Sequence, residues 1–503
     1  MEIRNLIKNI FLKPKSFFLE NIGVRQTIFK NTFWLAVAEG VTRLLKLILI
    51  IYVARILGAT EYGKFNFALA FVSLFIIFAD FGLSQITTRE FSRDKGREKE
   101  FSSILSLKIL LGLGTLILIL ISSFFITPDP IIQKVIWILA VYIIVNSFSG
   151  IISAFFQARQ QMEYQSWAQI LQALVVTAAG FFVILKFPSV ENLSYSYLFA
   201  SLIALIFILI FFHFKVFSLR ISWQKSIWQR FLSISWPLAL AGIFGGIYSL
   251  TDSVMMGYWG QITQTGWYNA ASKIIGVTFI PTSLISTSFY PALSKFFHDS
   301  KEKLQTAWNY FMDSMIILAF PIVVGGIVLS PRIIDFIYDP TYFPTGRETI
   351  LAFQILLIMA GLAFLSNPFS QILIVANQQK KLFSVTLAGA VINVILNLIF
   401  IPKYSLYGAA VATVATMAIV FFLLFRFTSK LTPVKPLNFK FFLNCISAIL
   451  ATIPMYFLII QPKIYNLNVF LSILIGAVVY GASLFIFKIL INYLKSYSVL
   501  KYL

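Results

Sequence analysis

Apolar stretches of about 20 residues or more dominate this sequence, and each is long enough to cross a lipid bilayer. The first runs from Asn31 to Leu57, and the second runs from Lys64 to about Ser84, after the short turn Gly58–Gly63. A hydrocarbon core about 30 Å thick requires about 20 helical residues to span it. The two stretches therefore predict a helical hairpin in a membrane.

The composition supports the same fold class for the whole chain. Hydrophobic residues make up 59% of the 503 residues and charged residues 12%, whereas soluble domains contain about 25% charged residues. This balance excludes a soluble enzyme. A membrane β-barrel would show alternating hydrophobicity over segments of about ten residues. We therefore expect an all-α polytopic membrane protein.

Hydrophobicity predicts fourteen spans, at residues 31–57, 64–84, 101–127, 131–156, 166–187, 193–214, 231–257, 266–293, 304–329, 346–374, 382–401, 405–426, 439–460 and 467–492. Lys and Arg gather in alternate connections, for example at Arg93, Arg220 and Lys301. Because cytoplasmic loops carry the excess of Lys and Arg, both termini are expected in the cytoplasm. This rule accounts for the net charge of +21 without a nucleic-acid partner.

The first 30 residues form a basic amphipathic segment. Apolar residues repeat there at helical spacing, from Ile3 to Phe11, with Arg4 and Lys8 between them. This pattern predicts an interfacial helix on the cytoplasmic leaflet, and a disordered basic tail is the alternative.

Residues that could support a cofactor or catalysis are scarce. The chain has one cysteine, Cys445, and two histidines, His213 and His298, which lie far apart in the sequence. We therefore expect no disulfide, no metal site and no cofactor. The sequence also lacks a phosphate-binding loop, so transport would be driven by an ion gradient, the membrane potential or the substrate gradient rather than by ATP hydrolysis in this chain.

Short motifs repeat between the two halves of the chain. Ala158-Arg159-Gln160-Gln161 matches Ala376-Asn377-Gln378-Gln379 at the equivalent place in the order of spans. The repeat predicts two six-helix lobes around a central cavity, 31–214 and 231–426, with a cytoplasmic linker at 215–230 and an appended helix pair and tail at 427–503. A chance match of short polar loops is the alternative.

Three charges in the first span are the strongest functional clue. Glu39, Arg43 and Lys46 follow the spacing i, i+4, i+7, which places them on one face of a helix. Each charge inside a membrane costs about 2.5–3.5 kcal/mol on insertion scales. The shared face is therefore expected to point toward protein or water. Arg43 would lie about 18 Å into the span, near the bilayer centre.

Other charges near the spans have weaker assignments. Asp252 and Lys273 are expected to pair across the hairpin of the seventh and eighth spans in a gating or structural contact. Asp80 is expected to neutralise basic residues nearby. Asp313 could bind a coupling ion or form a salt bridge, and Arg55 is expected to anchor the outer end of the first span.

Several spans also contain uncharged polar residues and prolines. Asn393 and Asn397 are expected to form interhelical hydrogen bonds, with sugar hydroxyls as the alternative partner. Pro237 interrupts a span next to the glycine-rich stretch Gly242–Gly246, which could provide the bending that alternating access requires.

Motifs in both halves resemble the polysaccharide transporter family of the multidrug/oligosaccharidyl-lipid/polysaccharide exporter superfamily. They include Ala54-Arg55-Ile56-Leu57-Gly58, Asp80-Phe81-Gly82-Leu83, Tyr268-Asn269-Ala270-Ala271-Ser272-Lys273 and the stretch from Ile392 to Pro402. The resemblance covers about residues 30–430. The family includes the Wzx-type flippases. The resemblance implies that the chain moves an oligosaccharide linked through diphosphate to a lipid, undecaprenol in the usual case, across a bacterial or archaeal plasma membrane.

With such a substrate, the charged face of the first span gains a specific role. Arg43 and Lys46 would bind the diphosphate, since Arg offers a bidentate fork to phosphate oxygens, and Glu39 would be their partner. Alternatively, Glu39 and Arg43 only neutralise each other. H⁺ or Na⁺ is the expected coupling ion, and polysaccharide polymerase machinery is a possible partner.

Two other functions compete with this reading. A drug/cation antiporter of the same superfamily would favour acidic residues in its cavity, whereas the first span carries two cations and one acid. An integral-membrane glycan polymerase or ligase would be expected to have a large external loop, and this sequence offers none longer than about 330–345.

Overall fold

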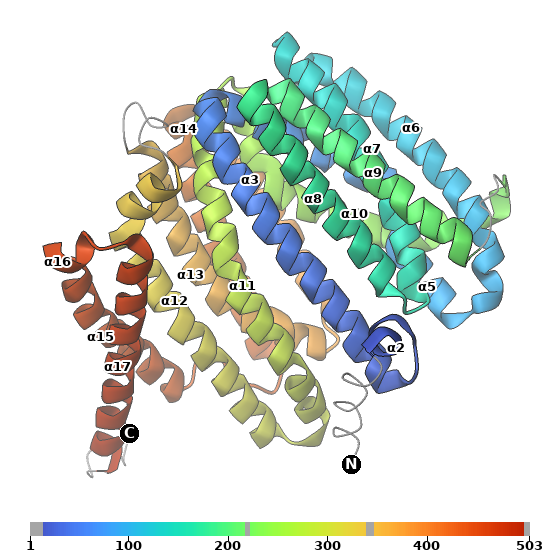
Figure 1. Cartoon of the computed structure of the whole chain (residues 1–503). Coiled ribbons are helices and arrows are strands. Elements are labelled where there is room, and N and C mark those ends of the chain that lie inside the picture. Colours follow the sequence, from blue (N-terminus) through green and yellow to red (C-terminus); the bar gives the residue numbers. More distant parts are fainter. Residues whose placement is uncertain (1–13, 217–221, 339–346, 497–503) are drawn as a thin grey trace. The chain divides into compact units, whose positions relative to one another are not determined.

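The computed structural model describes residues 14–216, 222–338 and 347–496, which are almost entirely helical (Figure 1). No strand occurs within these ranges. The predicted all-α class is therefore confirmed. The apolar repeat from Ile3 to Phe11 lies outside the described residues, as do residues 339–345 of the predicted external loop 330–345.

The chain divides into two compact units, Met1–Leu250 and Thr251–Leu503. In the first unit α7 is the central helix and contacts α3, α4, α5, α6, α8 and α9. Aromatic residues such as Phe91, Phe101, Phe155 and Phe212 form its buried core. The helices of this unit are α2 (Pro14–Leu19), α3 (Val24–Leu74), α4 (Ile76–Asp80), α5 (Leu83–Arg93), η1 (Lys95–Glu100), α6 (Phe101–Ile126), α7 (Pro130–Ala158), α8 (Met162–Lys186), α9 (Val190–Lys215) and most of α10 (Lys225–Tyr258).

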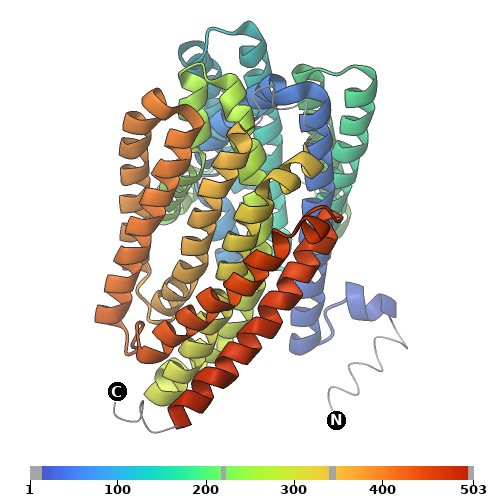
Figure 2. The same cartoon turned by 90° about the vertical axis from the view of Figure 1, so that its left-hand side faces the viewer.

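The second unit is built around α13, which contacts α11, α12 and α14. Helices α15 and α17 pack against each other and against α12, as Figure 2 shows. Met455 of α15 joins Trp308, Phe311 and Phe369 in the buried core. The helices are α11 (Ile262–Asp299), α12 (Lys301–Ile337), α13 (Glu348–Val375), α14 (Gln379–Leu431), α15 (Phe439–Ile459), α16 (Pro462–Tyr465) and α17 (Val469–Ser496).

The division between the units differs from the expected domain boundary. The predicted linker at 215–230 would place α10 in the second lobe, whereas α10 up to Leu250 lies in the first unit. The two six-helix lobes stay a prediction.

Twelve helices in the described ranges are long and apolar enough to cross a membrane. Two of them, α3 with 51 residues and α14 with 53, would be about 77–80 Å long if straight, more than twice the hydrocarbon thickness. Each bends instead, α3 at Gly58 (φ 76°) and α14 at Ser405 (φ 52°). Each therefore supplies two spans, which brings the total to the fourteen predicted.

The bend in α3 is tighter than the sequence suggests. A loop was expected over residues 58–63, but helical structure resumes at Ala59, directly after Gly58. Glycine adopts a positive φ without steric cost, so a single residue suffices to reverse the chain.

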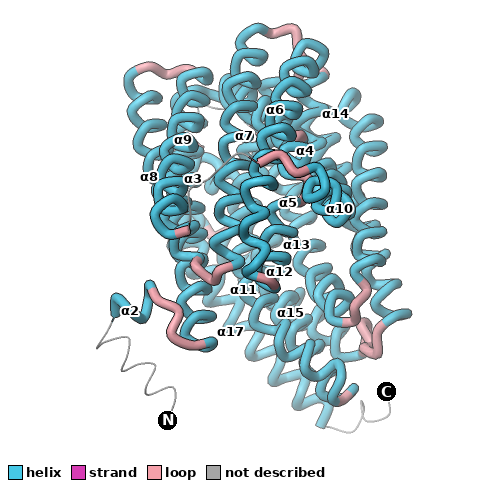
Figure 3. Tube along the Cα trace, turned by 90° about the vertical axis from the view of Figure 1, so that its right-hand side faces the viewer, coloured by secondary structure: helices cyan, strands magenta, loops and turns pink. Residues whose placement is uncertain are grey.

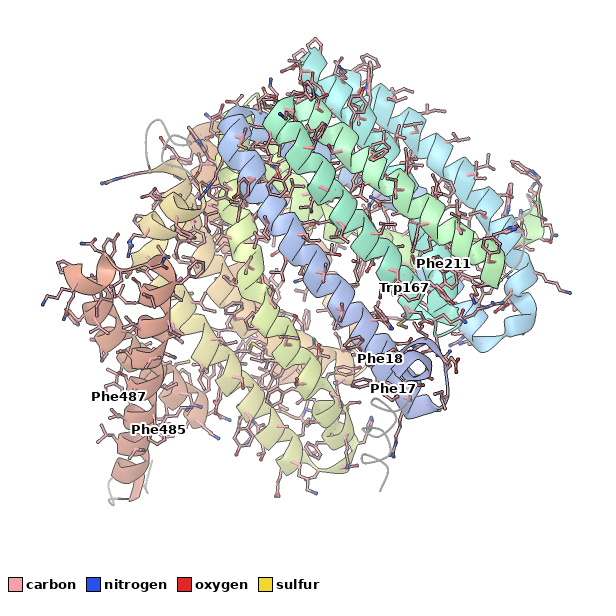
Figure 4. The ribbon with its side chains drawn as sticks, viewed as in Figure 1. Phe17, Phe18, Trp167, Phe211, Phe485 and Phe487 are labelled. Atoms are coloured by element: carbon pink, nitrogen blue, oxygen red, sulfur yellow. The ribbon has the colours of Figure 1, made fainter. Side chains whose placement is uncertain are left out.

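The N-terminal part of the described chain is fastened to α8 and to the turn before it. Lys30 and Glu163 are buried, and their side chains form an ion pair of 2.9 Å. Trp34 donates to the carbonyl of Phe18 at 2.8 Å and stacks edge-on against Trp167. Figure 4 shows Phe17 and Phe18 on α2, and Trp167 and Phe211 on α8 and α9. The start of the first span is thus held by both charge and aromatic packing.

The bend in α14 predicts a sensitive position at Gly408. A Cβ atom there would collide with the backbone carbonyl of Phe400, which cannot move without shifting the helix. We expect Gly408→Ala to lower the stability of the purified protein by about 2–3 kcal/mol, the upper range for overpacking. Gly276→Ala on α11 is the matched control, because no atom lies within 4 Å of its added Cβ. Thermal unfolding in detergent compares the two, and equal stabilities would contradict the prediction.

Candidate functional site

The predicted charged face is present on the first half of α3. The Nε of Arg43 donates to Oε1 of Glu39 at 2.5 Å, and the two side chains are 51% and 58% exposed. Arg43 has no other hydrogen bond within the described chain, so its two terminal guanidinium nitrogens have no protein acceptor there. Lys46 is half-buried, and none of the ion pairs among the described residues includes it. The face therefore combines a neutralised pair with a second cation.

This exposure restricts what the charged face can contact. Two charged side chains turned toward lipid tails would each cost about 2.5–3.5 kcal/mol. A polar environment is therefore the stable setting for Glu39 and Arg43. A face of this kind can bind an anion through Lys46 and through the terminal nitrogens of Arg43.

A second cluster surrounds Asp252 in the second unit. Asn397 donates to Oδ1 of Asp252 at 2.6 Å, Thr413 donates to Oδ2 at 2.8 Å, and the hydroxyl of Tyr268 also donates to Oδ2. Asp252 is 8% exposed and Asn397 is fully buried. These hydrogen-bond donors are neutral groups from α11 and α14. Lys273, the predicted partner of Asp252, is not one of them. Lys273 is half-buried on α11, five residues after Tyr268.

The cluster also contains oxygen atoms that could take a cation. Asn397 donates to Oδ1 of Asn393 at 3.0 Å, while its own Oδ1 is buried without a hydrogen-bond donor. Carboxylate, amide and hydroxyl oxygens from three helices therefore converge on one buried place. Oxygen ligands of this kind suit a hard cation, and a carboxylate can also take a proton.

Sequence reasoning identified Asp252, Asn393 and Asn397 separately but did not bring them together. The amides share a helix face because they are four residues apart, and that periodicity is visible in the sequence. Tyr268 and Thr413 were not selected as site residues. Their contact with Asp252 joins α10, α11 and α14, and such long-range contacts leave no local signal.

Asp80 has a buried cation as its partner. The Nζ of Lys108 on α6 donates to Oδ1 of Asp80 at 2.5 Å, and Lys108 is only 1% exposed. The expectation that Asp80 neutralises a basic residue thus has a specific partner. Sequence reasoning overlooked Lys108, although a single lysine inside an apolar span normally requires a counter-charge.

The remaining predicted residues lie apart from these clusters. Asp313 on α12 accepts a hydrogen bond from Asn444 on α15, so it links the core of the second unit to the appended helix pair. Arg55 is exposed near the end of the first half of α3.

Comparisons with known proteins bear on this arrangement. A curated relative named a probable low-salt glycan biosynthesis flippase, from Haloferax volcanii, is 23% identical over 400 residues, which cover 77% of this chain and 80% of that protein. A putative O-antigen transporter from Escherichia coli is 21% identical over 410 residues, which cover 79% of this chain and 96% of the relative.

Solved structures share the fold. The lipid II flippase MurJ in an inward closed conformation aligns with a TM-score of 0.73 at 18% identity, covering 90% of this chain and 97% of that one. An inward-facing multidrug resistance MATE transporter aligns with a TM-score of 0.63 at 16% identity, covering 78% and 95%.

Family models match both halves of the chain. The MatE model matches residues 237–399. The model described as polysaccharide biosynthesis protein matches residues 28–297, more than half of the chain, in agreement with the resemblance drawn from the sequence motifs. The chain therefore belongs to the polysaccharide biosynthesis protein family.

Proposed function

We propose that this protein is a flippase that moves a lipid-linked oligosaccharide across the plasma membrane for surface polysaccharide synthesis. The family match over residues 28–297 carries this conclusion. Relatives named as a glycan flippase and an O-antigen transporter support it over most of the chain. The protein is a multi-pass membrane transporter rather than an enzyme, and it works by alternating access.

Reconstitution into vesicles tests the function directly. A lipid-diphosphate oligosaccharide with a fluorescent sugar is quenched from outside by an impermeant reductant, and the protected fraction reports flipping. We expect protein-dependent exchange of the labelled lipid and no uptake of a cationic dye. Dye uptake without lipid exchange would instead favour the drug/cation antiporter.

The substrate-binding proposal concerns the diphosphate. Lys46 and the terminal nitrogens of Arg43 would replace water around the phosphate oxygens, while Glu39 holds Arg43 through its Nε. The excess of cations on this face supports an anionic substrate over a cationic drug. The expected carrier is undecaprenyl diphosphate, and a polysaccharide polymerase would use the product.

The coupling proposal concerns the Asp252 cluster. A buried carboxylate with neutral donors becomes more stable when it takes a cation, because the isolated charge is costly in an apolar interior. The unused Oδ1 of Asn397 and the hydroxyl oxygens of Thr413 and Tyr268 can serve the same ion. Na⁺ or H⁺ binding at Asp252 would then couple the ion gradient to transport. Asp313 is the weaker candidate, because the hydrogen bond that it accepts from Asn444 stabilises the packing of α12 against α15.

The topology is a proposal with its own test. With Cys445 changed to Ser, single cysteines at Lys95, Ser222, Lys301 and Lys380 should be protected from an impermeant thiol reagent in intact cells. Cysteines at Thr60 and Thr263 should react. Pro340, a further expected external position, lies outside the described residues. Labelling at any of the four expected cytoplasmic positions would contradict fourteen spans with both termini inside.

A further inference from the structure

The second span is broken in its backbone between α4 and α5. Phe81 and Gly82 both adopt the left-handed conformation, with φ of 49° and 74°. Glycine adopts this conformation freely, whereas a bulky aromatic residue such as Phe81 does so only where the surroundings impose it. The break is therefore held by other contacts.

Asp80 and Lys108 supply those contacts. Asp80 is the last residue of α4, and its Oδ1 accepts hydrogen bonds from Lys108 Nζ and from Ser84 Oγ on α5, both at 2.5 Å. The carboxylate thus ties the two sides of the break together and ties both to α6. We call Asp80, Ser84 and Lys108 the clamp.

Helix α10 lies directly against the broken segment. A Cβ on Gly82 would be 3.1 Å from both Leu238 Cβ and the Ser235 carbonyl oxygen, and a Cβ on Gly242 would be 2.5 Å from Ile77 Cδ1. The glycines thus allow α10 to approach both α4 and the break, which Figure 3 shows side by side. Pro237 lies within this contact and leaves α10 without one backbone hydrogen bond there.

The position of this contact along α10 gives it a mechanical consequence. The helix is continuous from Lys225 to Tyr258, so it passes from the first compact unit into the second and carries Asp252 beyond the boundary. A helix with an interior proline can bend at that point. Bending of α10 at Pro237 requires the neighbouring surface to keep its shape.

We propose that Lys108 is a positioning residue for transport: through Asp80 it fixes the left-handed break of the second span, against which α10 bends during the cycle. This inference rests on the proposed function only in that transport is one of its readouts. Lys108 contacts no substrate in this scheme. Its effect passes through the clamp to the Gly82 and Gly242 contacts.

Charge removal tests the clamp. Lys108→Met leaves Asp80, whose side chain is only 24% exposed, without its counter-charge, so we expect transport about tenfold slower or worse and reduced stability. Replacing both members of an ion pair with a buried partner by neutral residues often leaves stability unchanged, so Asp80→Asn/Lys108→Met should unfold near the wild-type temperature. If the clamp positions the break, this double variant still transports about tenfold more slowly, whereas a merely structural pair predicts full recovery of transport. Lys186→Met, at an exposed position, is the matched control.

Spin labels at Lys134 and Lys463, exposed residues in the first and second units, report the conformational cycle without any substrate. With Cys445→Ser as background, the distance distribution should shift with the ion gradient in the wild type and stay in one population in the double variant. A double variant whose distances shift as they do in the wild type, or one with wild-type transport, would overturn the proposal. If even the wild type does not flip the lipid while its distances respond to the gradient, the substrate assignment fails and the clamp proposal stands.

A second set of variants, which tests the steric contact between α10 and α4, covers the case in which the double variant does not fold. Gly242→Ala should slow transport about tenfold, because its Cβ would meet Ile77 Cδ1 at 2.5 Å, and Ile77→Ala added to it should restore the rate by removing that atom. Gly245→Ala, with no atom within 4 Å of the added Cβ, is the control. Wild-type transport in Gly242→Ala would show that α10 needs no close approach to α4.

Discussion

Asp252→Asn is expected to abolish the response of transport to an ion gradient while leaving the protein folded. Asn has the same shape as Asp, and its oxygen can still accept hydrogen bonds from Tyr268 and Thr413. Its NH2 group can donate to the unused Oδ1 of Asn397 once that amide turns over, so the packing of α10, α11 and α14 is retained. The negative charge, however, is lost. A charge-assisted contact is worth about 1.5–3 kcal/mol, which corresponds to a fall in ion affinity of about 10- to 100-fold.

Separate gradients identify the ion. Vesicles are loaded to give either a Na⁺ gradient at equal pH or a pH gradient without Na⁺, and flipping is measured in each. Thr413→Val removes a hydroxyl oxygen but no charge. It should weaken Na⁺-driven transport and affect H⁺-driven transport little, since a proton needs only the carboxylate.

Asp313→Asn is the matched control for Asp252→Asn, because it neutralises another intramembrane acid of the same unit. Asn444 donates to Asp313 and can donate to the Asn side chain as well. We expect this variant to keep the gradient response. If Asp252→Asn keeps it too, coupling does not occur at the Asp252 cluster.

The sequence predicts features that arise from local periodicity. The apolar runs define the spans, and the i, i+4 spacing of Glu39 and Arg43 predicts the ion pair that the structure contains. The turn at Gly58 was also visible, although it is shorter than expected. In each case the determining interaction lies within a few residues along one helix.

Contacts between distant helices could not be predicted in the same way. Lys108 and Asp80 are 28 residues apart, and Asp252 and Asn397 are 145 apart. A single intramembrane charge indicates that a partner exists, but several helices could provide it. The placement of α10 in the first unit likewise depends on packing, for example of Phe231 in the aromatic core, and not on the composition of residues 215–230.

Arg43→Ala is expected to reduce flipping of the lipid-diphosphate oligosaccharide by about 10- to 100-fold, the equivalent of one charge-assisted bond of about 1.5–3 kcal/mol. Membrane insertion should not suffer, since removing a charge from a span makes insertion easier. The structure sharpens the expectation for Arg43→Lys. Lysine can still neutralise Glu39, but it lacks the two terminal nitrogens that Arg43 leaves without a protein acceptor in the described chain. Partial activity is therefore expected.

The double variant Glu39→Gln/Arg43→Gln separates substrate binding from mutual neutralisation. If Arg43 only balances Glu39, removing both charges leaves no unpaired group, and transport should match the wild type. If Arg43 binds the diphosphate, the double variant should be as slow as Arg43→Ala, because Lys46 alone remains to neutralise the phosphates.

Lys46→Gln should then slow transport further in the Arg43→Ala background. Lys134→Gln, at an exposed position in the same unit, provides the control for loss of positive charge as such. A double variant with wild-type flipping and normal expression would remove Arg43 from the substrate site, since its exposed pair with Glu39 would then have no role beyond charge balance.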